Sequence, residues 1–314
     1  MGRYILRRLV LMIPVAFLVT VIVFTLIRLA PGDPVLAYAG EEKDPASLEA
    51  LRHEYGLDQP YYAQYVSWIG HALQGDLGRS IRTRQRVAEA IVERLPATLM
   101  LGSAALLISI SVALVVGTVS ALNRNKPIDL IATAAALGTV SLPNFFLGLL
   151  LILVFAALLR VLPPGGYTPL ANDPGDALRR LILPAITLAS ASLAVNLRQV
   201  RSSMLDVLAQ EYLRTARAKG LGEPAVVLRH ALKNALIPVV TLIGLQVGAI
   251  IEGAIITESI FFWPGVGKLA VDSIAGRDYP VVQAIVLVSA LSFMFATLVV
   301  DVIYAWLDPR ISYG

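Results

Sequence analysis

The chain has 314 residues, of which 57% are hydrophobic and only 15% are charged, and its mean hydropathy is +0.72. A soluble domain carries about 25% charged residues, so lipid must be the solvent for much of this chain. The lack of cysteine excludes disulfides and thiolate metal sites. The net charge of +4 fits cytoplasmic loops that face anionic lipid, and nucleic acid is not expected as a partner because no basic run is interleaved with aromatics.

Six apolar stretches reach or approach the ~20 residues that a helix needs to cross a bilayer. Pro143 interrupts the third stretch, and the fourth is short and is expected to extend into its flanks. The stretches are too continuously apolar for the alternating strands of a membrane barrel, so we predict an all-α integral membrane bundle. The predicted spans are Leu9–Ile27, Ala97–Leu122, Leu130–Leu159, Leu181–Leu197, Ala235–Thr257 and Tyr279–Val300.

The first span has two interpretations. Arginines precede it and Ala37-Tyr38-Ala39 resembles a cleavage site, which is typical of a signal peptide. Its apolar run is longer than the 7–15 residues of a signal sequence, so we predict an uncleaved anchor.

The placement of Lys and Arg predicts the orientation. With six spans both termini lie on one side, and that side carries the excess of basic residues once the long 28–96 loop is set aside. Because long loops do not count in the positive-inside rule, we predict that both termini are cytoplasmic. Residues 31–95 then lie outside and are expected to form a small helical cap, whereas the basic loop 198–234 lies inside.

The inner loop has the pattern of a helical hairpin. Four apolar residues recur at spacings of three and four, which predicts one helical stripe. Gly220 is expected to end that helix with a positive φ, and a second helix, 223–234, leads into the fifth span. Such a hairpin could dock on a cytoplasmic protein or lie on anionic lipid. The residues of the stripe are Leu205, Leu208, Tyr212 and Ala216.

Polar residues inside the predicted spans are candidate functional groups, because they are costly in lipid. Gln246 and Glu252 lie in the fifth span, where they could line the pathway or make structural contacts. Asn144 follows Pro143 in the third span, where the pair could mark a kink satisfied by a neighbouring helix or contact a substrate.

An aromatic cluster, Phe261, Phe262 and Trp263, is expected to be exposed near the end of the fifth span. It fits either an interfacial aromatic belt or a docking surface for a partner.

Nucleotide and metal sites are not predicted. Gly267-Lys268 hints at a phosphate loop, but Phe262 stands at the first glycine position and Leu269 replaces the required Ser or Thr. The three histidines have no second ligand at metal spacing. A membrane enzyme would need a clustered catalytic set and a secondary transporter would need ion-pair relays or a repeat, and the sequence shows neither.

Several stretches together resemble the permease subunits of binding-protein-dependent ABC importers, in the peptide/nickel branch that includes the dipeptide and oligopeptide permease B subunits. The inner loop resembles the coupling (EAA) loop of these permeases, although Arg214 and Thr215 stand at its Glu and first Ala positions. The other stretches that carry the resemblance are 28–34 (RLAPGDP), 55–60 (YGLDQP), 75–80 (GDLGRS), 94–98 (RLPAT), 141–143 (SLP), 262–267 (FWPGVG) and 277–280 (RDYP).

This resemblance implies a type I importer permease in a bacterial inner membrane, forming half of the pathway for peptides, with nickel or another small solute as alternative cargo. It also implies the partners: a second permease subunit, two cytoplasmic ATPase subunits that bind ATP and Mg, and an extracytoplasmic substrate-binding protein. No cofactor is expected on this chain. Residues 1–95 would hold the first span and outer loop, and residues 96–314 the permease core with its coupling loop 198–234.

The resemblance also assigns residue roles. Asn144, Gln246 and Glu252 become candidates for the pathway or its gate, and the aromatic cluster 261–263 becomes a candidate for docking of the binding protein. The residues implied in coupling to the ATPase are Tyr212, Ala216, Arg217, Ala218, Lys219, Gly220 and Leu221.

Overall fold

A computed structural model describes residues 2–29, 35, 44–248 and 254–307. The regular elements in these ranges are helices, and the one isolated bridge pairs Arg79 with Arg86. The chain divides into two compact units, Met1–Thr98 with Pro264–Gly314, and Leu99–Trp263. The long helix α5, Val87–Leu122, begins in unit 1 and continues into unit 2.

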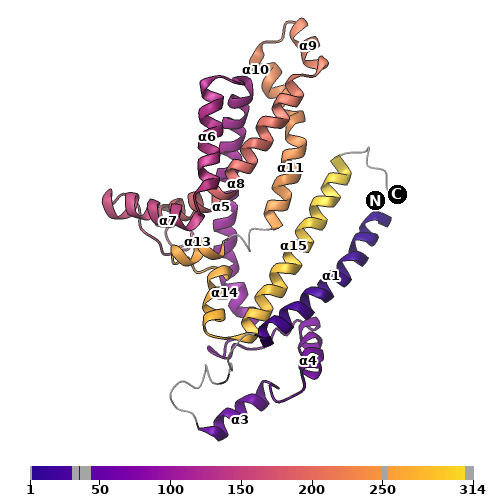
Figure 1. The fold of residues 1–314 in the computed structure, drawn as a ribbon, viewed down its shortest axis with the longest axis vertical. Helices are drawn as coiled ribbons and strands as arrows, with labels where there is room; N and C mark the ends of the chain where they lie inside the picture. Colours follow the sequence, from indigo (N-terminus) through magenta and orange to yellow (C-terminus); the bar gives the residue numbers. More distant parts are fainter. Residues whose placement is uncertain (1, 30–34, 36–43, 249–253, 308–314) are drawn as a thin grey trace. The chain divides into compact units, whose positions relative to one another are not determined.

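Unit 1 is built around two long apolar helices that pack along each other, α1 and α15 (Figure 1). The first described residues of α1 and the last of α15 lie at the same end of this unit. An aromatic cluster of Phe24, Tyr65 and Trp68 holds α4 against α1, and Thr20 Oγ1 lies 2.9 Å from the Tyr65 hydroxyl. The helices of unit 1 are α1 (Gly2–Leu29), α3 (Pro45–Glu54), α4 (Tyr61–Leu73), α14 (Val266–Ala275) and α15 (Tyr279–Leu307).

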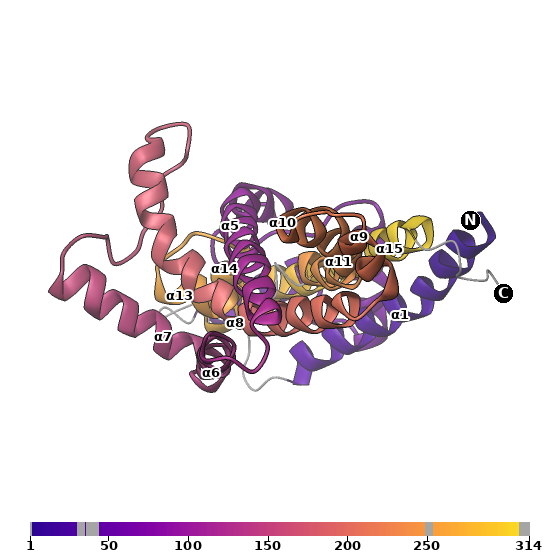
Figure 2. The ribbon, with the colours of Figure 1, turned by 90° about the horizontal axis from the view of Figure 1, so that it is seen from above.

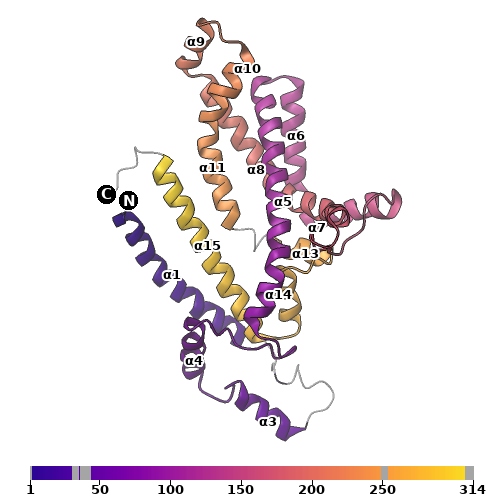
Figure 3. The same ribbon diagram turned by 180° about the vertical axis from the view of Figure 1, so that it is seen from behind.

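Unit 2 contains the remaining helices, among which α8 packs against both α6 and α11 (Figures 1 and 3). Its buried core is rich in alanine, and small residues let membrane helices approach closely. A Cβ on Gly117 of α5 would lie 2.9 Å from Val200 Cγ1 of α8, so this contact requires glycine. The elements are α6 (Pro127–Ser141), α7 (Asn144–Leu151), η1 (Ile152–Leu158), α8 (Pro174–Leu208), α9 (Glu211–Ala218), α10 (Glu223–Ala225), η2 (Val226–Ala231), α11 (Leu232–Gly248) and α13 (Ile255–Ile260).

The predicted all-α membrane architecture is confirmed, with one qualification on the number of spans. Among the described residues, five helices are long and apolar enough to cross a membrane. The predicted third span becomes α6 and α7, bent by 100° at Leu142–Pro143, and it makes a sixth span only if this pair is counted as one (Figure 2). The proline predicted the interruption, but its size depends on how α7 packs against α8 and α13.

Helix boundaries differ from the predicted ones mainly by extension. Helix α5 begins ten residues before Ala97, and α8 runs well beyond both ends of the predicted 181–197 stretch. Of the predicted fifth span, the structure describes α11 and the start of α13, whereas Glu252 lies outside the described residues.

The predicted single stripe of the inner loop is wrong. Leu205 and Leu208 belong to the end of α8, the chain turns at Ala209–Gln210, and Tyr212 and Ala216 belong to the separate helix α9. Gln210 has extended φ and ψ angles of −77° and 142°, which interrupts the helix. The turn allows α9 to fold back onto η2, so the apolar residues of the loop meet one another.

Candidate functional site

The inner hairpin, residues 211–231, buries its apolar face within the chain. Leu213 is fully buried and Ala216 is 8% exposed, and both belong to a core cluster with Val226 and Val227 of η2. Neither a partner protein nor lipid is therefore needed to cover these side chains. Ala216 supports the hairpin from inside and does not present its side chain to a partner.

Polar contacts fix the hairpin around its turn. Arg217 Nε donates to Glu223 Oε1 at 2.6 Å, and this hydrogen bond raises the pKa of Arg217. Asn234 Nδ2 donates to the Tyr212 hydroxyl at 2.7 Å, which joins α9 to α11. The predicted positive φ of Gly220 is confirmed at +79°, and its N–H donates to the Arg217 carbonyl at 2.9 Å.

The tip of the hairpin, Ala218–Leu221, is exposed. It connects α9 to α10, which lie at one end of unit 2 (Figure 3). A Cβ on Gly220 would meet no atom within 4 Å, so the space beside the turn is open. Tyr212 is 42% exposed and Arg217 is partly exposed next to this tip. Of the predicted coupling residues, all except Ala216 thus offer surface to a partner.

An ion pair between a buried acid of α6 and a partly exposed arginine of α8 was missed by the sequence analysis. Asp129, 2% exposed, accepts hydrogen bonds from Arg201 Nε at 2.7 Å and Nη2 at 2.8 Å. It also accepts from the Ser120 hydroxyl and from the backbone N–H of Asn125. The acid in the first turn of α6 and the basic loop were visible, but 72 residues separate the partners, so no local pattern could pair them.

The predicted intramembrane polar residues lie at two separate places in unit 2. Asn144 begins α7, where its Oδ1 accepts a hydrogen bond from Ser190 of α8 at 3.3 Å. This contact joins Asn144 to a neighbouring helix, and its role at the kink or toward a substrate stays a prediction. Gln246 of α11 instead pairs with Asn196 of α8, a residue that the sequence analysis did not single out.

The predicted exposed aromatic cluster is wrong for two of its three members. Phe261 and Trp263 are fully buried, whereas Phe262 is 72% exposed and has a φ of +53°. Glycines explain the burial, because a Cβ on Gly148 would lie 3.2 Å from the Phe261 ring and one on Gly165 would lie 2.3 Å from its carbonyl oxygen. Phe262 alone remains available for docking.

Trp263 is covered by the loop that precedes α8. Its ring meets that of Tyr167 edge to face, with centroids 4.9 Å apart. The backbone N–H of Gly166 donates to the Phe261 carbonyl at 2.7 Å, so the same loop also holds the turn after α13.

Two of the sequence stretches that carry the family resemblance meet in unit 1. Asp278 accepts hydrogen bonds from the Ser80 hydroxyl at 2.5 Å and from the Ile81 N–H at 3.1 Å. The stretches 75–80 and 277–280 therefore act together as a structural joint between the start of α15 and the loop before α5.

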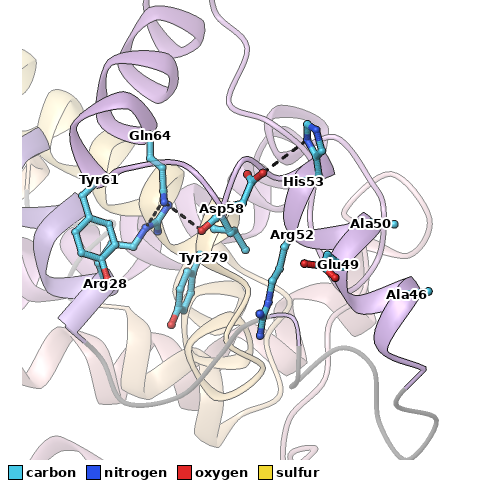
Figure 4. Close-up of a pocket in the computed structure, with 11 residues that line it drawn as sticks. Arg28, Ala46, Glu49, Ala50, Arg52, His53, Asp58, Tyr61, Gln64 and Tyr279 are labelled. Atoms are coloured by element: carbon cyan, nitrogen blue, oxygen red, sulfur yellow. Dashed lines mark hydrogen bonds and ion pairs between the residues drawn. The ribbon is translucent and has the colours of Figure 1, made fainter.

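Unit 1 also holds a cavity of about 870 Å³ beside α3 and α4 (Figure 4). Arg28 lines it, donates from Nε to Gln64 Oε1 at 2.9 Å, and lies 4.7 Å from the Phe24 ring centroid. Burial lowers the pKa of Arg28. These contacts anchor the end of α1 to α4. Among the described residues, no group of three or more His, Asp or Glu could hold a metal ion.

Known families and known relatives match this chain over nearly its full length. Residues 113–313 match the family described as binding-protein-dependent transport system inner membrane component, and residues 1–102 match the N-terminal region of such membrane components. The chain is 44% identical over 313 residues to the glutathione transport system permease protein GsiC of Escherichia coli O6:H1, with 100% of both chains covered. It is 43% identical to the proteins of the same name from Escherichia coli K12 and Shigella dysenteriae serotype 1, again over 100% of both chains.

Among solved structures, a crystal structure of an amino acid ABC transporter with histidines is similar at 18% sequence identity and a TM-score of 0.47. The similarity covers 71% of this chain and 94% of that chain.

Proposed function

Because this chain belongs to the family of binding-protein-dependent transport system inner membrane components, the permease subunits of ABC importers, we propose that its cargo is a peptide or a small peptide-like solute. The observation that carries this proposal is the 44% identity, over the full length of both chains, to permeases of glutathione transport systems. Glutathione is a tripeptide, so a permease of this kind must pass amide groups and charged termini. Such groups need polar partners throughout the hydrocarbon region.

We propose that the working complex contains a second, similar permease, two ATPase subunits that bind ATP and Mg, and an extracytoplasmic binding protein. Five or six candidate spans in one chain make up half of a pathway whose wall is completed by the second permease. Phe262 and Leu269 replace required residues of a phosphate loop, which supports a non-enzymatic role for this chain. Phe262, exposed after α13, is our candidate contact for the binding protein.

The hairpin tip is the proposed contact with the ATPase subunits. Its surface combines apolar Leu221, the cation Lys219 and the turn at Gly220, and the contacts of Arg217 and Tyr212 hold it in one conformation. A rigid surface loses little conformational entropy when it docks, which favours transmission of ATPase movement into α8 and α11. Docking must differ between nucleotide states, since an equilibrium shifts only through differential affinity.

We further propose that both termini and the hairpin are cytoplasmic. The basic residues of the short loops support the cytoplasmic orientation. The first described residues of α1 and the last of α15 lie at the same end of unit 1, which supports a shared side for the two termini.

The proposal is tested by uptake into proteoliposomes that contain the assembled complex, ATP inside and the binding protein outside. Radiolabelled glutathione, a dipeptide and Ni²⁺ are supplied in parallel. We expect ATP-dependent uptake of at least one of the two peptides. Uptake of nickel alone would contradict a peptide cargo and leave the family assignment intact.

A further inference from the structure

A hydrogen-bonded polar group joins three membrane helices inside unit 2. Asn196 of α8 and Gln246 of α11 pair through both amides, with Asn196 Nδ2 to Gln246 Oε1 at 3.1 Å and Gln246 Nε2 to Asn196 Oδ1 at 2.7 Å. Asn196 Nδ2 also donates to the Ser109 hydroxyl of α5 at 2.8 Å. Ser192, one turn before Asn196, donates to the same hydroxyl at 3.0 Å. All four residues lie in helices long and apolar enough to span a membrane.

The group is buried at one end and open at the other. Ser109 is fully buried and Asn196 is 1% exposed, so both are enclosed by the helices that carry them. Gln246 is partly exposed at the surface of unit 2. Its hydrogen bonds within the described residues are those to Asn196, so one amide hydrogen and part of the carbonyl oxygen face away from the group.

That outward amide indicates what the surface faces. An unsatisfied amide group in hydrocarbon costs several kcal/mol, so polar side chains in membrane helices face protein or water. Asn196 is saturated, since both of its amide hydrogens and its oxygen are engaged. It can therefore hold Gln246 in one orientation. The second amide hydrogen of Gln246 and part of its carbonyl oxygen then stay available to a group outside unit 2.

We propose that Gln246, held by Asn196 and Ser109, faces the water-filled translocation pathway and exchanges hydrogen bonds with the amide groups of the cargo. A primary amide suits this role because it both donates and accepts, as a peptide group does, and carries no charge that would trap a zwitterion. Asn196 and Ser109 are positioning residues in this arrangement. The inference rests on the proposed peptide cargo and names one contact for it.

The first experiment uses the cysteine-free chain, in the assembled complex, to measure exposure to water. Gln246→Cys and Leu107→Cys are treated with a charged methanethiosulfonate during ATP turnover. Leu107, an apolar side chain that is 66% exposed on α5, is the comparison position, because we expect an exposed apolar side chain of a membrane helix to face lipid. We expect position 246 to react at least tenfold faster, and a transported peptide with its binding protein to slow that reaction about fivefold.

Equal reaction rates at the two positions would overturn the proposal. If position 246 reacts quickly but the peptide does not slow the reaction, the contact with cargo is overturned. Failure of the proposed function is distinguished by a different result, since the wild-type complex would then import no peptide at all.

The second experiment measures selectivity, which a merely structural role would not change. Wild type, Gln246→Leu and Asn196→Leu complexes are compared for uptake of a dipeptide and of its backbone N-methyl analogue. Each variant should import the dipeptide about fivefold more slowly, the worth of one hydrogen bond. Each should also lose the wild-type preference for the unmethylated dipeptide at the permease step, measured with saturating binding protein.

Unchanged discrimination in Gln246→Leu, with normal subunit stoichiometry, would refute the contact with cargo. The variant Ser103→Ala is the matched control, because the Ser103 hydroxyl is exposed on α5, donates to the Met100 carbonyl of its own helix and lies outside the group. It should retain both the uptake rate and the preference.

Discussion

At the scale of single residues, Gly220 connects a backbone requirement to the coupling surface. Its φ of +79° lies in the left-handed region, where other residues are strained by about 1–2 kcal/mol, yet the space around it is open. A side chain added here would therefore change the turn and the surface without displacing the core.

We predict that Gly220→Trp separates ATP hydrolysis from uptake while the permease still folds. The indole would occupy the exposed tip, and a change in a docking surface can cost 2 kcal/mol or more. Gly220→Asn is the control, since asparagine tolerates positive φ and is small. Uptake and ATPase activity are measured together on reconstituted complexes of checked stoichiometry. Normal coupled uptake by the tryptophan variant would argue that the tip does not touch the ATPase.

Asp129 is expected to matter for stability because it is buried and paired with Arg201. The carboxylate is almost fully buried and receives two hydrogen bonds from Arg201, which is itself 27% exposed. Removing one partner of a fully buried pair costs about 3–5 kcal/mol. Water reaches Arg201, so the loss here is expected to be smaller.

We predict that Asp129→Asn lowers the stability of the purified permease by about 2 kcal/mol, because it leaves the Arg201 charge without its counter-ion. The melting temperature in detergent should fall by several degrees. Asp206→Asn, at an exposed position near the end of α8, should change it little. Equal melting temperatures for the two variants would mean that the ion pair contributes nothing to stability.

At the scale of elements, close helix packing limits which glycines can be replaced. Gly117 on α5 faces Val200 and the Leu197 carbonyl oxygen of α8, at 2.9 and 3.1 Å from an added Cβ. Gly138 on α6 would place its Cβ in open space. The two positions share the helical conformation and differ in their surroundings.

We predict opposite effects of the same substitution at these glycines. Gly117→Ala should destabilise unit 2 by about 1–3 kcal/mol, because α5 and α8 must move apart. Gly138→Ala should be neutral or stabilise by up to about 1 kcal/mol, since alanine favours a helix. Thermal unfolding of both variants in detergent gives the comparison. Similar losses at both positions would mean that helix packing does not decide the outcome.

At the scale of the whole molecule, orientation in the membrane decides which surfaces meet which partners. The hairpin can contact the ATPase subunits only if it is cytoplasmic. The loop that contains α3 and α4 is then expected on the opposite side of the membrane.

We predict that a cysteine in place of Tyr62 is labelled in intact cells by an impermeant maleimide, whereas one in place of Arg214 is not. Both side chains are well exposed, 75% and 73%, so accessibility within the protein does not decide the result. Permeabilised cells, in which both cysteines should react, are the control. Labelling of position 214 alone in intact cells would reverse the proposed orientation.

The sequence by itself determined the membrane class, most spans, the hairpin turn at Gly220 and the family. These properties depend on short windows: about 20 apolar residues require a lipid environment whatever surrounds them, and a glycine after a helix marks a positive φ. The family followed from several short motifs taken together, and full-length similarity to known permeases confirmed it.

Only the tertiary structure decided which polar and aromatic residues are buried and with whom they pair. Phe261 and Phe262 are adjacent residues of the same type, yet Phe261 is fully buried and Phe262 is 72% exposed. The reason is that Phe261, and not Phe262, packs against Gly148 and Gly165. Asn196 and Gln246 lie 50 residues apart in the chain, and the packing of α8 against α11 makes them a pair. Burial and pairing depend on contacts between segments that are distant in the sequence, and local periodicity does not predict which of these segments come into contact.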